Sequence, residues 1–249
     1  MEHGKSTTIK IMCGILTPDS GICKINGFIP YKDRKKYVKD IGVVFGNRSA
    51  LWWDVPVEDS FELIKEIYNI SDENYKKQRN MLTEMLNIGE IIKTPTRQLS
   101  LGQRMRCEIA AAFLHEPKIV FLDEPTSGLD PATTLQIHSM MKTLKESGTT
   151  IFLTTHNMNE AQKMCDHLAL LNEGNIVEEG TPEDICLLHR KKCEVNIEMT
   201  NGEKYMVDSH DLLTVLQTVL DTNNKIRSIH SNEPNLEEVF IELTGRDLR

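Results

Sequence analysis

The first residues of the chain have the composition of a phosphate-binding loop. Gly4-Lys5-Ser6-Thr7-Thr8 runs directly into an amphipathic helical pattern. A helix N-terminus offers unpaired N–H groups to a phosphate, the Lys5 ammonium can reach terminal phosphates, and the Ser6 hydroxyl can bind Mg²⁺. Taken alone, the same residues could equally form a turn that caps a helix.

Two carboxylates end a second segment that could do chemistry. Asp123 and Glu124 follow the apolar run Ile119–Leu122. Ligands of open α/β sheets bind at the carboxyl ends of strands, so Asp123 could hold Mg²⁺ through its water shell and Glu124 could polarise an attacking water. Pro125 is expected to push Glu124 away from helical conformation and so keep it at the strand edge. The alternative is an acidic pair that opens a turn.

A histidine ends a third segment. His156 follows the run 149–155, which begins with β-branched and apolar residues. Its imidazole could donate a hydrogen bond to a γ-phosphate, or it could be satisfied by neighbouring backbone.

Two further segments combine helix capping with possible phosphate contact. In Leu99-Ser100-Leu101-Gly102-Gln103, Ser100 and Gln103 have the spacing of a capping box, while Gly102 would let a phosphate approach the helix N-terminus closely. In Ser127-Gly128-Leu129-Asp130-Pro131, Asp130 is expected to cap the next helix, with Pro131 at its first position. Capping and catalysis are compatible at both places.

Alternating strands and helices must position these groups. Apolar runs at 41–45, 119–122 and 149–154 are typical of parallel strands covered on both faces. Between the first two, apolar residues recur at helical spacing, which indicates a helical insertion.

The character of the chain changes after Pro182. Alternation at 195–199, a turn at Asn201-Gly202 and a strand at 204–207 predict a hairpin. A helix at 212–220, a short strand near 226–229 and a helix at 236–243 that ends before Gly245 complete a small appendage.

Composition excludes several classes. The 249 residues are 39% hydrophobic and 27% charged, which is too apolar for a disordered chain. No window approaches the ~20 apolar residues of a membrane helix, and the N-terminus lacks the pattern of a secretory leader. A net charge of -8 argues against broad nucleic-acid binding. Six cysteines without C-x-x-C spacing indicate free thiols in a reducing cytosol.

In this order and at these separations, the motifs resemble the nucleotide-binding subunit of an ABC transporter over essentially the whole chain. Residues 4–8 are similar to the end of Walker A, 99–103 to the family signature, 121–124 to Walker B, 127–130 to the D-loop, and His156 to the switch histidine.

The resemblance implies an α/β fold, with a P-loop NTPase core, a mostly parallel sheet, a helical subdomain and a small α+β appendage. We expect the core at 1–46 and 117–185, the helical signature subdomain at 47–116, and the appendage at 186–249.

It also implies an ATPase that uses ATP and Mg²⁺. The residues that would bind the ATP phosphates are Gly4, Lys5, Ser6, Thr7 and Thr8. The catalytic residues would be Glu124 and His156, and the ligands of Mg²⁺ would be Ser6, Asp123 and the Q-loop residue Asn47.

Two cassettes of this family close head to tail, which implies a homodimer. The signature residues Ser100, Gly102 and Gln103 would then contact the γ-phosphate bound by Lys5 of the other subunit, with Asp130 in the D-loop. The dimer would be cytoplasmic and peripheral on the inner face of the membrane, where it would drive an integral membrane permease. No nucleic-acid partner is expected.

Two stretches are similar to export-type ATPases encoded separately from their permeases. They are residues 45–56, which include Trp52 and Trp53, and the ending 236–245. The aromatic pair lies where the family contacts its permease, although packing of Trp52 and Trp53 within the helical insertion is equally open.

Three positions depart from the family pattern. Asn47 replaces a usual glutamine and is one methylene shorter, and Leu101 replaces a signature glycine at a position that need not face phosphate. Walker A normally begins with two earlier glycines; the chain begins after the first, and Glu2 stands at the second. We therefore expect a chain shortened at its N-terminus, with ATP binding weakened on the order of 10²-fold by lost backbone donors.

Two other functions stay open from the sequence. One is a catalytically silent or impaired partner subunit. The other is a soluble ABC-type ATPase that does not engage in transport.

Overall fold

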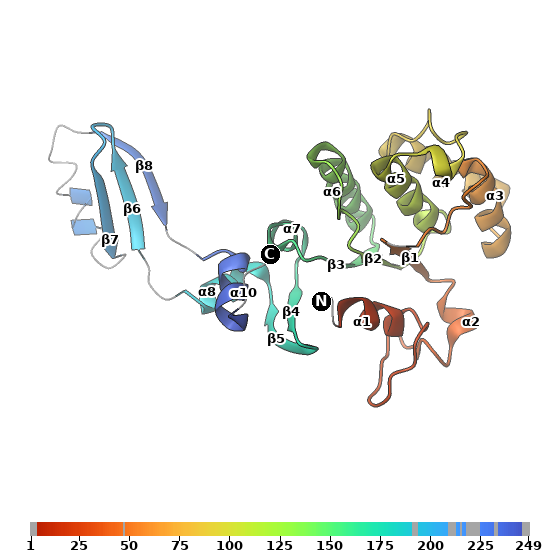
Figure 1. Ribbon diagram of the computed structural model, residues 1–249, viewed down its shortest axis with the longest axis horizontal. Helices are drawn as coiled ribbons and strands as arrows, with labels where there is room; N and C mark the ends of the chain where they lie inside the picture. The colour runs from red at the N-terminus through yellow and green to blue at the C-terminus, as the bar shows by residue number, and fades with distance from the viewer. Residues whose placement is uncertain are drawn as a thin grey trace. The chain divides into compact units, whose positions relative to one another are not determined.

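The computed structural model describes residues 4–46, 48–190, 194–208, 213–214, 216–217, 225–231 and 234–245. The chain divides into two compact units, Met1–His156 and Asn157–Arg249. Figure 1 traces the order of their elements.

The first unit contains a three-stranded parallel sheet with helices around it. Its elements, in chain order, are α1 (Lys5–Met12), α2 (Arg34–Tyr37), β1 (Ile41–Phe45), α3 (Val57–Tyr68), α4 (Asp72–Met85), the 3₁₀ turn η1 (Thr96–Gln98), α5 (Leu101–Phe113), β2 (Ile119–Asp123), α6 (Pro131–Glu146) and β3 (Thr150–Thr154).

The predicted strands and the helical insertion are confirmed. The sheet has the order β1-β2-β3, and all neighbouring strands are parallel. The register aligns Phe45 with Asp123 and Asp123 with Thr154. The carboxyl ends of the three strands therefore meet at one rim.

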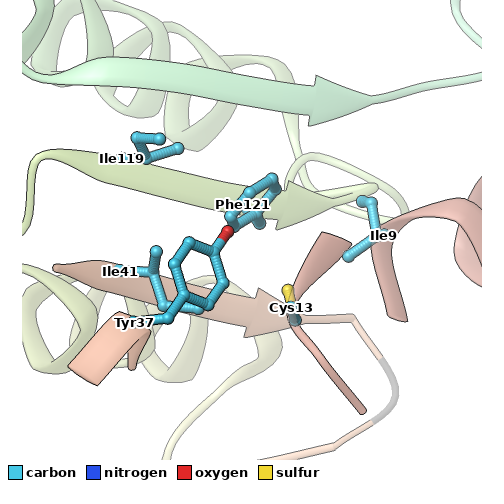
Figure 2. Close-up of a cluster of buried hydrophobic side chains, with 6 residues drawn as sticks. All are labelled: Ile9, Cys13, Tyr37, Ile41, Ile119 and Phe121. Atoms are coloured by element: carbon cyan, nitrogen blue, oxygen red, sulfur yellow. The ribbon is translucent and has the colours of Figure 1, made fainter. Parts of the chain in front are cut away.

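Helices α1 and α5 cover opposite faces of β1, as Figure 1 shows. On one face, Ile9 of α1 and Cys13, which directly follows this helix, pack with Ile41 and Phe121 in a buried cluster that also contains Tyr37 and Ile119 (Figure 2). Because strand side chains alternate, Gly42 faces the other side, where a Cβ would lie 2.4 Å from the carbonyl oxygen of Ala112 in α5. The sheet can approach α5 this closely only because residue 42 has no side chain.

The prediction that both faces of each strand are covered is wrong for β3. Strand β2 is buried from Ile119 to Leu122, whereas Phe152 of β3 is 37% exposed. The two exposed residues of β3, Thr150 and Phe152, alternate with less exposed ones, so the face that carries them is less covered.

The second unit contains α7 (Met158–Met164), β4 (Leu168–Asn172), β5 (Asn175–Gly180), α8 (Pro182–Leu188), β6 (Glu194–Met199), β7 (Lys204–Asp208), β8 (Ile226–Ser231) and α10 (Leu236–Thr244). The hairpin β6–β7, the strand β8 and the α10 helix ended by Gly245 in left-handed conformation confirm the predictions. Most of the helix expected at 212–220 lies outside the described residues.

The antiparallel hairpin β4–β5 was not predicted. Its turn, Glu173-Gly174, has positive φ at both residues, the conformation of a tight two-residue hairpin loop. Leu170 of this hairpin shares a buried cluster with Ile185 of α8 and Leu236 of α10. Helix α8 spans the domain boundary that we expected at 185–186. The division into a core at 1–46 and 117–185, a helical subdomain at 47–116 and an appendage at 186–249 stays a prediction.

Three of the described cysteines, Cys13, Cys107 and Cys186, are buried. Burial raises the pKa of the Cys13 thiol to about 12, so it stays protonated and packs as a small apolar side chain. Among the helices of the described residues, none is long and apolar enough to cross a membrane.

We predict that Gly42→Ala destabilises the first unit by about 1–3 kcal/mol, because the new Cβ would overlap the α5 backbone. Denaturant unfolding followed by tryptophan fluorescence measures this unit, since both tryptophans lie in it. Gly89→Ala is the matched control, because its Cβ would make an ordinary 3.5 Å contact with Thr83. Equal unfolding midpoints for the two variants would contradict the prediction.

Candidate active site

The N-terminus of α1 has the geometry of an anion site. Gly4 takes a φ of 121°, and its carbonyl oxygen accepts from both the amide and the hydroxyl of Thr8 at 2.8 Å. No side chain within the described residues caps this helix, and its first turn contains no acid. By contrast, α4, α5, α6, α7, α8 and α10 each have a side-chain cap. Among the described residues, the first-turn N–H groups of α1 therefore have no carboxylate or hydroxyl cap that competes with a ligand.

Lys5, the first residue of α1, reaches the rim of the sheet. Its Nζ donates to Glu124 Oε1 at 3.2 Å and to the Thr155 carbonyl oxygen at 3.2 Å. The other carboxylate oxygen of Glu124 lies 2.8 Å from His156 Nδ1. Lys5, Glu124 and His156 thus form one chain of contacts.

Exposure differs along this chain of contacts. The side chain of Glu124 is only 16% exposed and that of Lys5 is 26% exposed, whereas His156 is 62% exposed. The carboxylate therefore lies at the inner end of the cluster, while the imidazole is open to solvent or to a ligand.

Asp123 occupies the rim beside this cluster. Its Oδ1 accepts a 2.6 Å hydrogen bond from the Thr154 hydroxyl, and its carbonyl oxygen accepts from the Gly46 amide at 3.2 Å. The register that pairs Asp123 with Thr154 creates the first contact. Asp123 is therefore oriented by the neighbouring strand while its second carboxylate oxygen is available to a cation.

The backbone at Glu124 is strained. As expected, this residue lies directly at the end of β2 and is not in right-handed helical conformation, but its φ of 52° places it in the left-handed region. Its amide still donates to the Thr154 carbonyl at 3.0 Å, while its own carbonyl accepts from Ser127 at 3.2 Å. The chain turns sharply at this residue, and the turn aims the carboxylate at Lys5 and His156. A non-glycine residue in this region is uncommon and costs free energy.

The signature segment forms the predicted capping box. The Gln103 amide donates to Ser100 Oγ at 3.2 Å, and the Ser100 amide donates to Gln103 Oε1 at 2.9 Å. The first turns of α5 and α6 lie close together at Gly102, since a Cβ added there would lie 3.0 Å from Thr133 Cγ2.

The D-loop segment also caps its helix as predicted. Asp130 accepts hydrogen bonds from the amide and the hydroxyl of Thr133, at 2.9 and 2.6 Å. These bonds lower the pKa of Asp130, and the bond from the hydroxyl has the largest effect. Leu101 contacts this segment, because a Cβ on Gly128 would lie 3.3 Å from its Cδ2.

The signature residues and the residues at the rim of the sheet have separate hydrogen-bond partners. Within the part of the chain that the structure describes, no hydrogen bond or ion pair joins the signature residues to Lys5, Asp123, Glu124 or His156. Asn47 and Glu2 lie outside the described residues.

The tryptophans expected to contact a permease are exposed. Trp52 and Trp53 are 58% and 52% exposed, and the guanidinium of Arg104 lies over the Trp53 ring at 5.9 Å from its centroid. Neither ring is buried in the helical insertion.

Two site residues escaped the sequence analysis. Thr154 orients Asp123, and the carbonyl of Thr155 binds Lys5. The signal was present in the parallel pattern, since residues that end neighbouring strands share one rim, but the register could not be read from the sequence.

The donor chemistry at the rim suits Mg²⁺ with a triphosphate. Magnesium retains several waters and is bound by one or two carboxylates plus phosphate oxygens. Ser6 and Asp123 could contribute a hydroxyl and a carboxylate. No cluster of three or more histidine, cysteine or acidic side chains that could hold a metal occurs within the described residues, so this site offers no complete protein cage.

The chain is similar in sequence to known proteins. The sequence model of the ABC transporter family matches residues 3–127, half of the chain. The linearmycin resistance ATP-binding protein LnrL of Bacillus subtilis is 26% identical, covering 99% of this chain and 88% of the relative. The Nod factor export ATP-binding protein I of Ralstonia nicotianae is 29% identical, covering 99% and 83%.

A solved structure has the same fold. It is the dimeric, post-hydrolysis state of the ATP-binding cassette MJ0796 bound to ADP and Pi, with a TM-score of 0.62 and 27% identity over 71% of this chain and 80% of that one. The family match, the relatives and the rim that gathers Lys5, Glu124 and His156 lead to one conclusion. This chain belongs to the ABC transporter family and is one of its ATP-binding, ATP-hydrolysing subunits.

Proposed function

We propose that α1 and Lys5 bind the terminal phosphates of ATP and that Glu124 and His156 carry out hydrolysis. The observation that supports this most is the contact of Glu124 with both Lys5 and His156 at the carboxyl rim of the sheet. The uncapped first turn of α1, residues Gly4 to Thr8, supplies amide donors and a positive dipole end for the phosphates.

Binding of ATP would rearrange the lysine. A triphosphate carries more negative charge than one carboxylate, so Lys5 would exchange Glu124 for phosphate oxygens. Glu124 would then lose its bond to Lys5 and keep its contact with His156. Its free oxygen could accept the proton of the attacking water. The exposed imidazole of His156 would turn toward the γ-phosphate.

Mg²⁺ would be held by Ser6, Asp123 and Asn47 together with phosphate oxygens and water. When bound, it neutralises charge that develops on the transferred phosphoryl group. Thr154 would keep the Asp123 carboxylate oriented for this role.

A second copy of this chain would complete each site. Ser100, Gly102 and Gln103, with Asp130 beside them, have no bond to Lys5 of their own chain, which suits a contact with ATP held by the other subunit. The dimeric state of the related cassette supports this arrangement.

Transport is better supported than the alternatives. The two relatives compared above are named as resistance and export ATP-binding proteins, which favours an export-type transporter over an ATPase outside transport. A silent subunit is disfavoured because Lys5, Glu124 and His156 are all present and in contact.

We further propose that the chain works at the cytoplasmic face of a membrane, where Trp52 and Trp53 contact the permease. Both rings are more than half exposed, and aromatic side chains with a neighbouring guanidinium are typical of protein contact surfaces.

We predict that Lys5→Ala lowers the affinity for Mg²⁺-ATP by at least about tenfold, the effect of losing one charge-assisted hydrogen bond. Glu124→Gln should keep ATP affinity but lower turnover about 10²–10⁴-fold, as expected for loss of a general base. Equilibrium dialysis and phosphate release measure the two quantities.

Lys10→Ala, in the last turn of the same helix, is the matched control and should change neither quantity. Unchanged turnover in Glu124→Gln would remove Glu124 from the role of base. Absence of ATP binding by the unaltered chain would contradict the proposed site as a whole.

We predict that replacing Trp52 and Trp53 together by serine releases the chain from the membrane fraction of its native cells while leaving ATP binding intact. The expected cause is loss of the aromatic contact area with the permease. Immunoblots of sedimented membranes measure the distribution. Ile176→Ser, which alters an apolar residue of the second unit that is 58% exposed, is the control, and equal membrane association of both variants would refute the contact.

A further inference from the structure

A buried carboxylate of α5 binds the segment that carries the tryptophans. Glu108 is 5% exposed, and its two oxygens accept hydrogen bonds from the Ser49 hydroxyl and from the Ala50 amide, the latter at 2.9 Å. We call residues 48–53 the tryptophan loop. It leads from the end of β1 to Trp52 and Trp53.

The same face of α5 contacts the loop one turn earlier. Arg104 lies four residues before Glu108, a spacing that places both side chains on one side of a helix. Its guanidinium covers the Trp53 ring. A third link comes from the residues just before α5, where the Arg97 amide donates to the Trp53 carbonyl at 3.0 Å.

The loop is also ordered internally. Ser49 Oγ lies 3.0 Å from the Leu51 carbonyl oxygen and 3.1 Å from the Leu51 amide nitrogen. The Trp52 amide donates to the Ser60 hydroxyl at 3.0 Å. Because Ser49 binds both Glu108 and the next turn of the loop, the carboxylate lies at the centre of this network.

The charge of Glu108 does not improve folding. Burial is the largest influence on its carboxyl group and raises its pKa above the ordinary value, despite the opposing bonds from Ser49 and Ala50. The folded protein therefore binds this proton more readily than the unfolded chain, so the contribution of Glu108 to stability falls as pH rises through that range.

We propose that Glu108 is a positioning residue that binds the tryptophan loop to α5, so that Trp52 and Trp53 move together with the signature residues Ser100–Gln103 at the N-terminus of that helix. This rests on the proposed function, in which Ser100–Gln103 meet ATP on a second subunit and the tryptophans meet the permease. Glu108 itself touches neither ATP nor the permease and acts through Ser49 and Ala50.

The chain provides its own reporter for this coupling. Its two tryptophans are both in the loop, so intrinsic fluorescence and its quenching by acrylamide report on the loop alone. The experiment uses the full chain as the Glu124→Gln variant, in which bound ATP should persist. ATP binding, dimerisation by light scattering and acrylamide quenching are measured with and without Mg²⁺-ATP.

In this parent we expect Mg²⁺-ATP to change the quenching of the tryptophans. Adding Glu108→Gln should leave ATP affinity, dimerisation and the midpoint of thermal unfolding at neutral pH unchanged or higher. The quenching response should be lost in large part, because the tryptophan loop then loses its charge-assisted hydrogen bond to α5.

Ser49→Ala is the second variant, because it removes the partner hydroxyl with little effect on packing. It should reproduce the loss, and the double variant should add little, since both changes remove the bond between Ser49 and Glu108 while a glutamine oxygen can still accept from the Ala50 amide. Glu58→Gln is the matched control: it removes a carboxylate that pairs with Arg79 on neighbouring helices and should leave the quenching response intact.

Three outcomes would overturn the inference. The first is a parent that binds ATP and dimerises without any change in quenching. The second is a full quenching response in Glu108→Gln or Ser49→Ala. The third is a response that falls only in step with thermal stability in both variants, which would make Glu108 merely structural. A parent that neither binds ATP nor dimerises would instead contradict the proposed function on which the inference rests.

Discussion

The register of three parallel strands determines where the chemistry of this protein lies. Because Phe45, Asp123 and Thr154 are aligned, the residues at and after the strand ends meet at one rim. A shift of one residue would turn Asp123 to the opposite face and break its bond with Thr154. The buried cluster on the α1 side and the close approach of α5 at Gly42 on the other side keep this register in place.

At the rim, Glu124 and the phosphates of ATP would compete for the ammonium group of Lys5. In this structure Lys5 binds Glu124 and the Thr155 carbonyl, and a triphosphate would offer the same ammonium a stronger anion. The sharp backbone turn at Glu124, with its positive φ, points the carboxylate toward both Lys5 and His156. In the proposed function, substrate binding and activation of the base would thereby be linked through the side chain of Lys5.

Helix α5 connects the other functional regions of the first unit. Its N-terminus bears the capping box of Ser100 and Gln103, and its first turn lies against that of α6. One face of the helix contacts the tryptophan loop through Arg104 and Glu108. Leu101, which departs from the family signature, packs on Gly128 and adds a contact between the signature and the D-loop.

The sequence by itself determined the features that depend on short separations: the strands at 41–45 and 119–123, the caps at Ser100 and Asp130, the end of α10 at Gly245, and the order of the motifs. Each arises from bonds or patterns within a few residues, which neighbouring side chains encode directly. Only the tertiary structure decided that Lys5 meets Glu124, that Thr154 orients Asp123 and that Glu108 binds Ser49. These pairs are 31 to 119 residues apart, and their contact depends on strand register and helix packing, which no local pattern specifies.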